Sequence, residues 1–144
     1  MSTKPTNPKD GVGSTKLPLH LVPDTLMIYA SMAFTEGDAK YGMYNFRTSG
    51  VRVSIYLDAL GRHMMKFKNG EWEDRVTKVP HLASAAACIA ILIDGFAMGN
   101  ITDDRPYPLD LNDEIAESER IIAHVRELHK DKNPHRWTIE DAQP

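Results

Sequence analysis

The stretch VRVSIYLDALGRHMMKFKNGEWEDRVTKVPHLASAAACIAILID, residues 51–94, is expected to decide the fold of this chain. It contains two runs in which apolar residues recur at helical spacing, joined by a short polar connection. The first run carries Asp58 and His63, the connection is acidic, and the second run opens with His81. Titratable side chains therefore gather on one predicted helical hairpin, which the rest of the chain is expected to cover.

Hydrophobic periodicity and helix-breaking residues predict an all-α fold, a bundle of about four helices with an extended N-terminal arm. The predicted helices cover residues 24–36, 51–68, 80–98 and 110–130. Asp24 is expected to cap the first helix, and Gly37 and Gly42 are expected to end it. The third helix is rich in alanine on several faces, which favours a central position. No sheet of more than two short strands is expected.

Length and composition indicate one domain over residues 1–144. Its predicted parts are an arm at 1–23, a helical core at 24–109, an amphipathic helix at 110–131 and a tail at 132–144. The net charge of −3 argues against an extended nucleic-acid partner. The single cysteine, Cys88, excludes an intrachain disulfide and favours a cytoplasmic location. The longest apolar run, 82–93, is too short to span a bilayer, so no membrane partner is expected.

Two segments outside the hairpin have the composition of a phosphate or nucleotide contact. The run from Gly11 to Lys16 can present backbone N–H groups and an ammonium group, or it can be a flexible arm. The run KYGMYNFR, residues 40–47, mixes two cations with three aromatic rings. Such a loop can stack on a base and neutralise phosphates, or its rings can pack on the core.

The hairpin itself suggests a metal site. Glu71 and Asp74 have E-x-x-D spacing, which suits Mg²⁺ but also occurs in ordinary solvated turns. Asp58 and Arg62 stand four residues apart, as in a helical ion pair. His81 lies at a helix start, where the helix dipole disfavours the imidazolium and leaves a ring that can act as ligand or base.

Short matches in one order resemble a family of phage proteins, the dATP/dGTP diphosphohydrolase N-terminal domains. They are Asn7-Pro8-Lys9-Asp10, Gly13 to Leu19, Pro23, Lys40-Tyr41-Gly42, Asn45, Arg47, Tyr56, Asp58, Arg62-His63, Gly70-Glu71, Asp74, Pro80 to Ala83, Ile91-Leu92, Asp94 and Asp103 to Pro106. The resemblance implies handling of purine deoxynucleotides, near the all-α, Mg²⁺-dependent MazG-type pyrophosphohydrolases. MazG-type enzymes carry an E-E-x-x-E helix, whereas the matching helix here offers only Asp58 and His63.

Residues and resemblance together predict hydrolysis of a purine (deoxy)nucleoside triphosphate to monophosphate and pyrophosphate, in the host cytoplasm if the chain is phage-encoded. The predicted catalytic residues are His63 and His81; the nucleotide-binding residues are Lys9, Lys16, Lys40, Tyr41, Asn45, Arg47 and Arg62; and the Mg²⁺ ligands are Asp58, Glu71 and Asp74. Tyr41, Tyr44 or Phe46 is expected to face the base. A dimer or tetramer is expected. The alternatives are a non-catalytic protein that sequesters a signalling nucleotide and a purely structural module.

Overall fold

The computed structural model describes residues 7–142, so residues 1–6 of the predicted arm and 143–144 of the predicted tail lie outside it. The chain divides into two compact units, Met1–Asp103 and Asp104–Pro144. The first contains α1 (Lys9–Gly13), the 3-10 helix η1 (Leu19–Leu21), α2 (Asp24–Tyr41), α3 (Asn45–Ser49), β1 (Val51–Arg52), α4 (Val53–Lys68), α5 (His81–Met98) and β2 (Ile101–Thr102). The second contains α6 (Asn112–Leu128) and the 3-10 helix η2 (Ile139–Asp141). The predicted all-α class is confirmed.

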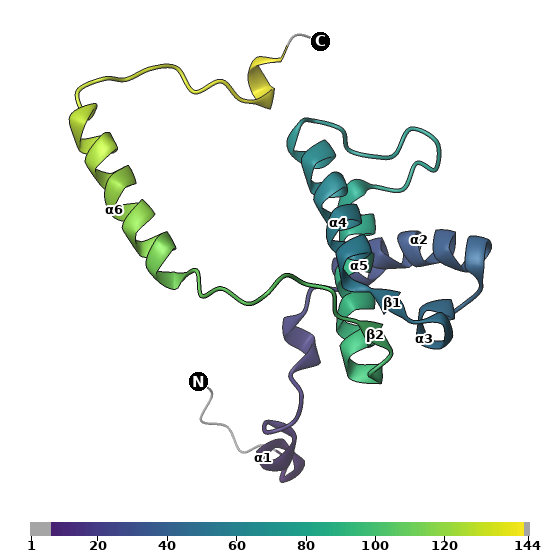
Figure 1. Cartoon of the computed structure of the whole chain (residues 1–144). Coiled ribbons are helices and arrows are strands. Elements are labelled where there is room, and N and C mark those ends of the chain that lie inside the picture. Colours follow the sequence, from purple (N-terminus) through teal and green to yellow (C-terminus); the bar gives the residue numbers. More distant parts are fainter. Residues whose placement is uncertain (1–6, 143–144) are drawn as a thin grey trace. The chain divides into compact units, whose positions relative to one another are not determined.

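The core of the first unit forms around α5. Helix α4 lies along α5 in a helical hairpin, and α2 packs on α5 as well (Figure 1). The buried residues of α5 are mostly small, with Ala83, Ala85 and Ala87 among them. Because these side chains are short, two helices can approach the backbone of α5 closely, as the alanine-rich pattern predicted.

Helix α5 also passes a membrane-span test. Among the described residues it is the one helix long and apolar enough, by length and composition, to cross a bilayer. The central helix of a helical bundle can meet the same criterion of length and composition. Helix α5 packs against α2, α3 and α4, as such a central helix does.

A short parallel strand pair closes the end of the hairpin remote from the polar connection. Strand β1 pairs with β2, with Val51 opposite Ile101. Gly95 of α5 lies under this pair, and a Cβ atom there would come within 3.0 Å of Val51 and 3.1 Å of Ile101. A glycine at this position therefore lets the strands lie directly against the central helix.

Several element boundaries in the first unit differ from the predictions. Helix α2 continues through Gly37 to Tyr41 and ends at Gly42, whose φ of +90° suits glycine. The prediction that Gly37 ends the helix was therefore wrong; an isolated glycine inside a helix costs only about 1 kcal/mol. Asp24 is the first helical residue and makes no capping hydrogen bond. Val51 is in a strand rather than in α4, because Asn100 supplies a carbonyl partner for its N–H at 3.4 Å.

The arm is less extended than predicted. Residues 9–13 form α1, and the backbone N–H groups of Ser14, Thr15 and Lys16 donate to carbonyls within the same turn, at 2.9–3.2 Å. These three N–H groups are thus occupied by carbonyls of the arm itself, and the lysine side chains are the candidate phosphate donors of this segment.

In the second unit, α6 is an amphipathic helix, as predicted, although it covers residues 112–128 rather than 110–130. Its apolar residues, including Ile115, Ile122 and Val125, are exposed. After it, Trp137 is also exposed and packs edge-on against His135, with ring centroids 4.4 Å apart.

Candidate functional site

The connection between α4 and α5 is a folded loop held by its own backbone. The N–H of His81 donates to the carbonyl of Trp72 at 2.9 Å, and the N–H of Asp74 donates to Val79 at 3.0 Å. The indole of Trp72 lies 6.4 Å from the ring of Tyr29 and 6.3 Å from that of Phe67. Trp72 thereby fixes the loop to α2 and α4, and the residue before it, Glu71, is brought next to the start of α5.

Four side chains form a connected chain of polar contacts in this region. Nδ1 of His63 lies 3.0 Å from Nδ1 of His81, and Nε2 of His81 lies 2.7 Å from Oε2 of Glu71. The other carboxylate oxygen of Glu71 accepts from Nε of Arg75 at 2.9 Å. His81 has no exposed surface, His63 is half-buried, and Arg75 is almost fully exposed. This series of contacts therefore connects the buried His81 with solvent on two sides, through His63 and through Arg75.

The hydrogen-bond pattern assigns the ring protons. A carboxylate only accepts, so Nε2 of His81 donates to Glu71. In the neutral ring, Nδ1 of His81 is then an acceptor, and Nδ1 of His63 must donate to it. The lone pair of neutral His63 is consequently on Nε2, which has no hydrogen-bond partner in the part of the chain that the structure describes. His63 is thus the outer member of the pair and presents a basic nitrogen.

Electrostatics keep this arrangement in the required protonation states. Burial, together with the nearby rings and charges of His81, Lys66 and Arg62, lowers the pKa of His63. The hydrogen bond from His81, followed by the contact with Arg75, lowers the pKa of Glu71. A lowered pKa keeps the histidine neutral and the carboxyl ionised near neutral pH. Such a pair, a neutral base and an ionised orienting group, is typical of acid–base sites.

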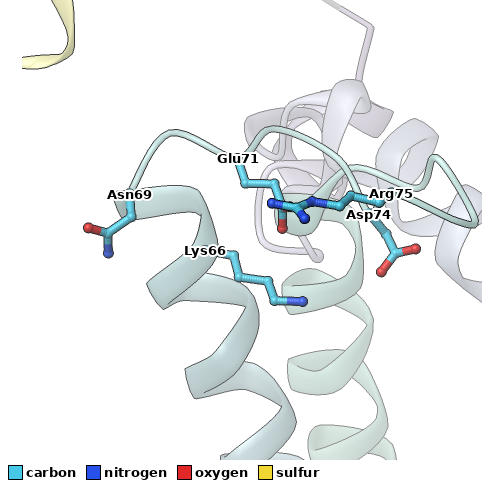
Figure 2. Close-up of a pocket in the computed structure, with 5 residues that line it drawn as sticks. All are labelled: Lys66, Asn69, Glu71, Asp74 and Arg75. Carbon is cyan, nitrogen blue, oxygen red and sulfur yellow. The ribbon is translucent and has the colours of Figure 1, made fainter. Parts of the chain in front are cut away.

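An open surface pocket of about 470 Å³ adjoins the outer end of Glu71, and all of its lining residues are polar. They are Lys66, Asn69, Glu71, Asp74 and Arg75. Figure 2 shows the guanidinium of Arg75 beside the carboxylate of Glu71 and the ammonium of Lys66 extended from α4 below them. Asn69 points away from the others, and its amide nitrogen donates to the carbonyl of Met65 at 2.9 Å.

The predicted Mg²⁺ ligands do not form a three-carboxylate site. Both oxygens of Glu71 are bonded to His81 and Arg75, and Asp58 is exposed on α4. Within residues 7–142 there is no group of three or more His, Cys, Asp or Glu side chains placed to hold a metal ion. Oδ1 of Asp74 accepts the N–H groups of Val76 and Thr77 at 2.8 Å each, which lowers its pKa. The side chain of Thr77 contributes to the same lowering of the pKa of Asp74.

The predicted nucleotide loop is tied back to the core. The guanidinium of Arg47 donates to both oxygens of Asp94, at 3.0 and 2.9 Å, and stacks on the ring of Tyr44 at 4.6 Å. The bonds from Arg47 lower the pKa of Asp94, so this carboxyl is a pairing partner rather than a solvated helix end. The ring of Phe46 packs against Phe34, with centroids 6.0 Å apart. Part of the loop thus supports the fold, the second of the two predicted alternatives.

The other predicted nucleotide-binding residues are spread over the first unit. Lys40 at the end of α2 pairs with Glu36 at 2.6 Å, and Tyr41 beside it is exposed. Asn45 begins α3. Arg62 is exposed on α4, and the described residues show no ion pair between it and Asp58. In the same part of the chain, Lys9 and Lys16 make no side-chain bond to the hairpin.

Sequence reasoning missed Arg75 and Lys66. The spacing of four between Glu71 and Arg75 was a detectable signal, since the two pair at that separation. Lys66 lies three residues after His63, on the same side of a helix, and this spacing also predicts proximity.

The hairpin, its histidine pair and the polar pocket place a candidate acid–base site in a small helical protein. The chain belongs to the dATP/dGTP diphosphohydrolase N-terminal domain family, whose model matches residues 6–105. The match covers the first compact unit almost completely and ends at residue 105, just inside the second. No significant match was found among curated proteins or among solved structures.

Proposed function

We propose that the protein hydrolyses a purine deoxynucleoside triphosphate to the monophosphate and pyrophosphate, and that it serves phage nucleotide metabolism in the host cytoplasm. The observation that carries the proposal is the continuous chain from Glu71 through His81 to His63, in a member of the dATP/dGTP diphosphohydrolase N-terminal family. In this series of contacts, His63 presents one neutral imidazole nitrogen toward solvent, and the ionised carboxylate of Glu71 lies at the opposite end, beyond His81.

The chemistry follows from the proton positions. A water molecule attacks the α-phosphorus and forms a new P–O bond, while Nε2 of His63 accepts the water proton. The bond between the α-phosphorus and the bridging oxygen breaks, and pyrophosphate leaves with the electron pair. His81, which has no exposed surface, does not contact the water but shares the developing positive charge. Glu71 holds His81 in the required tautomer and stabilises that charge, as a carboxylate does in a catalytic triad.

Magnesium remains part of the proposal. Mg²⁺ is held by one or two carboxylates together with substrate phosphates and waters, so it does not require an all-protein cage. The second oxygen of Asp74 is the candidate ligand, because the first is used by the loop backbone and Glu71 is fully engaged. When bound, the ion would neutralise phosphate charge.

An oligomer is also proposed. Three large apolar side chains of α5, Ile89, Ile93 and Phe96, are about half or more exposed, at 46%, 66% and 49%. Their spacing of four and three places them on one stripe of the helix. An exposed apolar stripe on a core helix is typical of an interface, and a second copy of this chain is its proposed occupant.

The function is tested by incubating the full chain with dATP, dGTP, ATP, GTP and dTTP, in Mg²⁺ or in EDTA, and separating the products by anion-exchange chromatography. We expect purine deoxynucleoside monophosphate and pyrophosphate in equal amounts. His63→Asn should lower the rate by about 10²–10⁴-fold, the usual contribution of a general base, whereas the exposed His20→Asn should not. Nucleotide retained without turnover would replace the hydrolase by a sequestering protein, and neither binding nor turnover would leave only a structural module.

A further inference from the structure

The polar pocket beside Glu71 has donors suited to phosphate, and none of its lining residues is aromatic. Each of its lining residues is polar or charged, and its volume of about 470 Å³ lies in the range of small-ligand sites, roughly 300–1,000 Å³. Ligand pockets for bases supply aromatic or aliphatic faces for stacking. A pocket without them selects the charged end of a nucleotide.

Arg75 contacts Glu71 in a way that leaves the two terminal nitrogens of its guanidinium available to a ligand. Glu71 takes only Nε of the guanidinium, at 2.9 Å. The two terminal nitrogens of Arg75 are in no ion pair or hydrogen bond within residues 7–142. A guanidinium fixed at Nε presents two parallel N–H donors at its other edge, which match two oxygens of a phosphate.

Lys66 supplies the second cation. Its backbone carbonyl accepts the N–H of Glu71 at 3.0 Å, so the lysine lies directly beneath the loop that carries the arginine. Its ammonium is in no ion pair in the described part of the chain and extends under Glu71 and Arg75 in Figure 2. Lys66 follows His63 by three residues on α4, which places the two side chains on the same side of that helix. Lys66 thus lies between the pocket it lines and the basic nitrogen of His63.

The two carboxylates in the pocket already have hydrogen-bond partners within the protein. Glu71 is shared between Arg75 and His81, and one oxygen of Asp74 accepts two backbone N–H groups. Their negative charge is thus partly offset before any ligand enters, while the outer donors of Lys66 and Arg75 are not used. A ligand that pairs with both cations is an anion that offers oxygens to each of them, as a diphosphate can.

The geometry points to the Lys66–Arg75 pocket as the subsite for the pyrophosphate end of the substrate, the β- and γ-phosphates. This assignment rests on the proposed function, since it places the α-phosphorus at the inner edge of the pocket, toward His63. It also makes inorganic pyrophosphate, the product, a ligand of the same pocket. The alternative is a purely structural role, in which the charge of Lys66 stabilises the C-terminal end of α4 and Arg75 only forms an ion pair with Glu71.

The test is calorimetric titration of the full chain with inorganic pyrophosphate in Mg²⁺ buffer, which needs no turnover. We expect Lys66→Met and Arg75→Met each to weaken pyrophosphate binding by at least about tenfold, the loss of one charge-assisted bond. Lys68→Met is the matched control, because Lys68 is on the same last turn of α4 but outside the pocket, and it should bind within about twofold of the parent. Thermal unfolding of each variant confirms that it is folded.

The outcomes separate this assignment from the hydrolase proposal. A parent protein that hydrolyses nucleotide but does not bind pyrophosphate, or binds it equally in all three variants, overturns the subsite and leaves the hydrolase. A parent that binds pyrophosphate through Lys66 and Arg75 but hydrolyses no nucleotide supports the subsite and overturns the hydrolase.

Discussion

Nδ1 of His63 lies 3.0 Å from Nδ1 of His81, so two chemically equal nitrogens share one hydrogen bond. Only one of them carries the proton, and the Glu71 carboxylate on the far side of His81 decides which. The buried ring is thereby an acceptor toward its neighbour, and the half-buried ring keeps its free lone pair outward. This relationship determines which histidine nitrogen can accept a proton from outside, and several measurable properties of the site depend on it.

The pH dependence should show a low-pH limit set by His63. Burial and the nearby His81 and Lys66 lower the pKa of His63 below its ordinary value of 6.5. The neutral base is therefore present above the lowered value, and kcat/KM should fall as pH drops through a midpoint below 6.5. Between that midpoint and 6.5 the unfolded chain binds more protons, so the free energy of unfolding should rise with pH. A midpoint above 6.5 in an NMR titration of this ring would contradict the account.

Glu71→Gln should lower kcat, because Glu71 acts through His81 on the proposed base His63. The amide cannot stabilise positive charge on the histidine pair as the carboxylate does. Loss of this charge should also move the low-pH limit of the kcat profile, which a purely structural role would not do. Glu73→Gln, on the same loop and exposed, is the matched control and should behave like the parent.

Asp74→Asn should remove Mg²⁺-dependent binding of nucleotide while the protein stays folded. The amide oxygen of asparagine can still accept the N–H groups of Val76 and Thr77, so the loop keeps its shape. The second oxygen, the proposed Mg²⁺ ligand, becomes an NH₂ group that cannot bind a cation. Calorimetric titration with nucleotide, with Mg²⁺ and with EDTA, measures the effect; equal affinity in both buffers for the parent would remove the metal from the mechanism.

Gly50→Ala should destabilise the first unit by about 1–3 kcal/mol, because φ of +74° and ψ of 173° form a region that only glycine adopts readily. The added Cβ would also lie 2.8 Å from Oδ1 of Asn100, whose amide bonds the carbonyl of Arg47. Gly61→Ala is the opposite case, in mid-helix with open space around it, and should stabilise by up to about 1 kcal/mol. Urea denaturation compares the two, and equal stability of both variants would be inconsistent with this backbone geometry.

The exposed stripe of α5 predicts self-association. The double change Ile89→Glu with Ile93→Glu places two charges on that stripe and should shift the protein toward the monomer, since buried unpaired charges are costly. Val76→Glu, at an exposed loop position away from the stripe, should keep the parent's mass. Light scattering coupled to size-exclusion chromatography reports the mass of each; a monomeric parent would end the proposal.

The sequence alone determined the fold class and the hairpin on which the candidate site lies. Apolar residues at helical spacing placed all four long helices, since this signal depends only on local geometry. The local sequence also indicated that titratable side chains would gather on this hairpin, because a short connection between two helices brings their facing ends together. The tight turn at Gly70 and the proline before α5 made that connection visible.

The tertiary structure alone decided how these residues are paired. The sequence suggested Glu71 as a Mg²⁺ ligand, whereas the path of the loop gives its oxygens to His81 and Arg75. It suggested Arg47 for nucleotide, whereas the fold brings Arg47 to Asp94, 47 residues away. Such partners depend on the register of one helix against another, and this register follows from side-chain packing, such as that of Trp72, which no local pattern encodes.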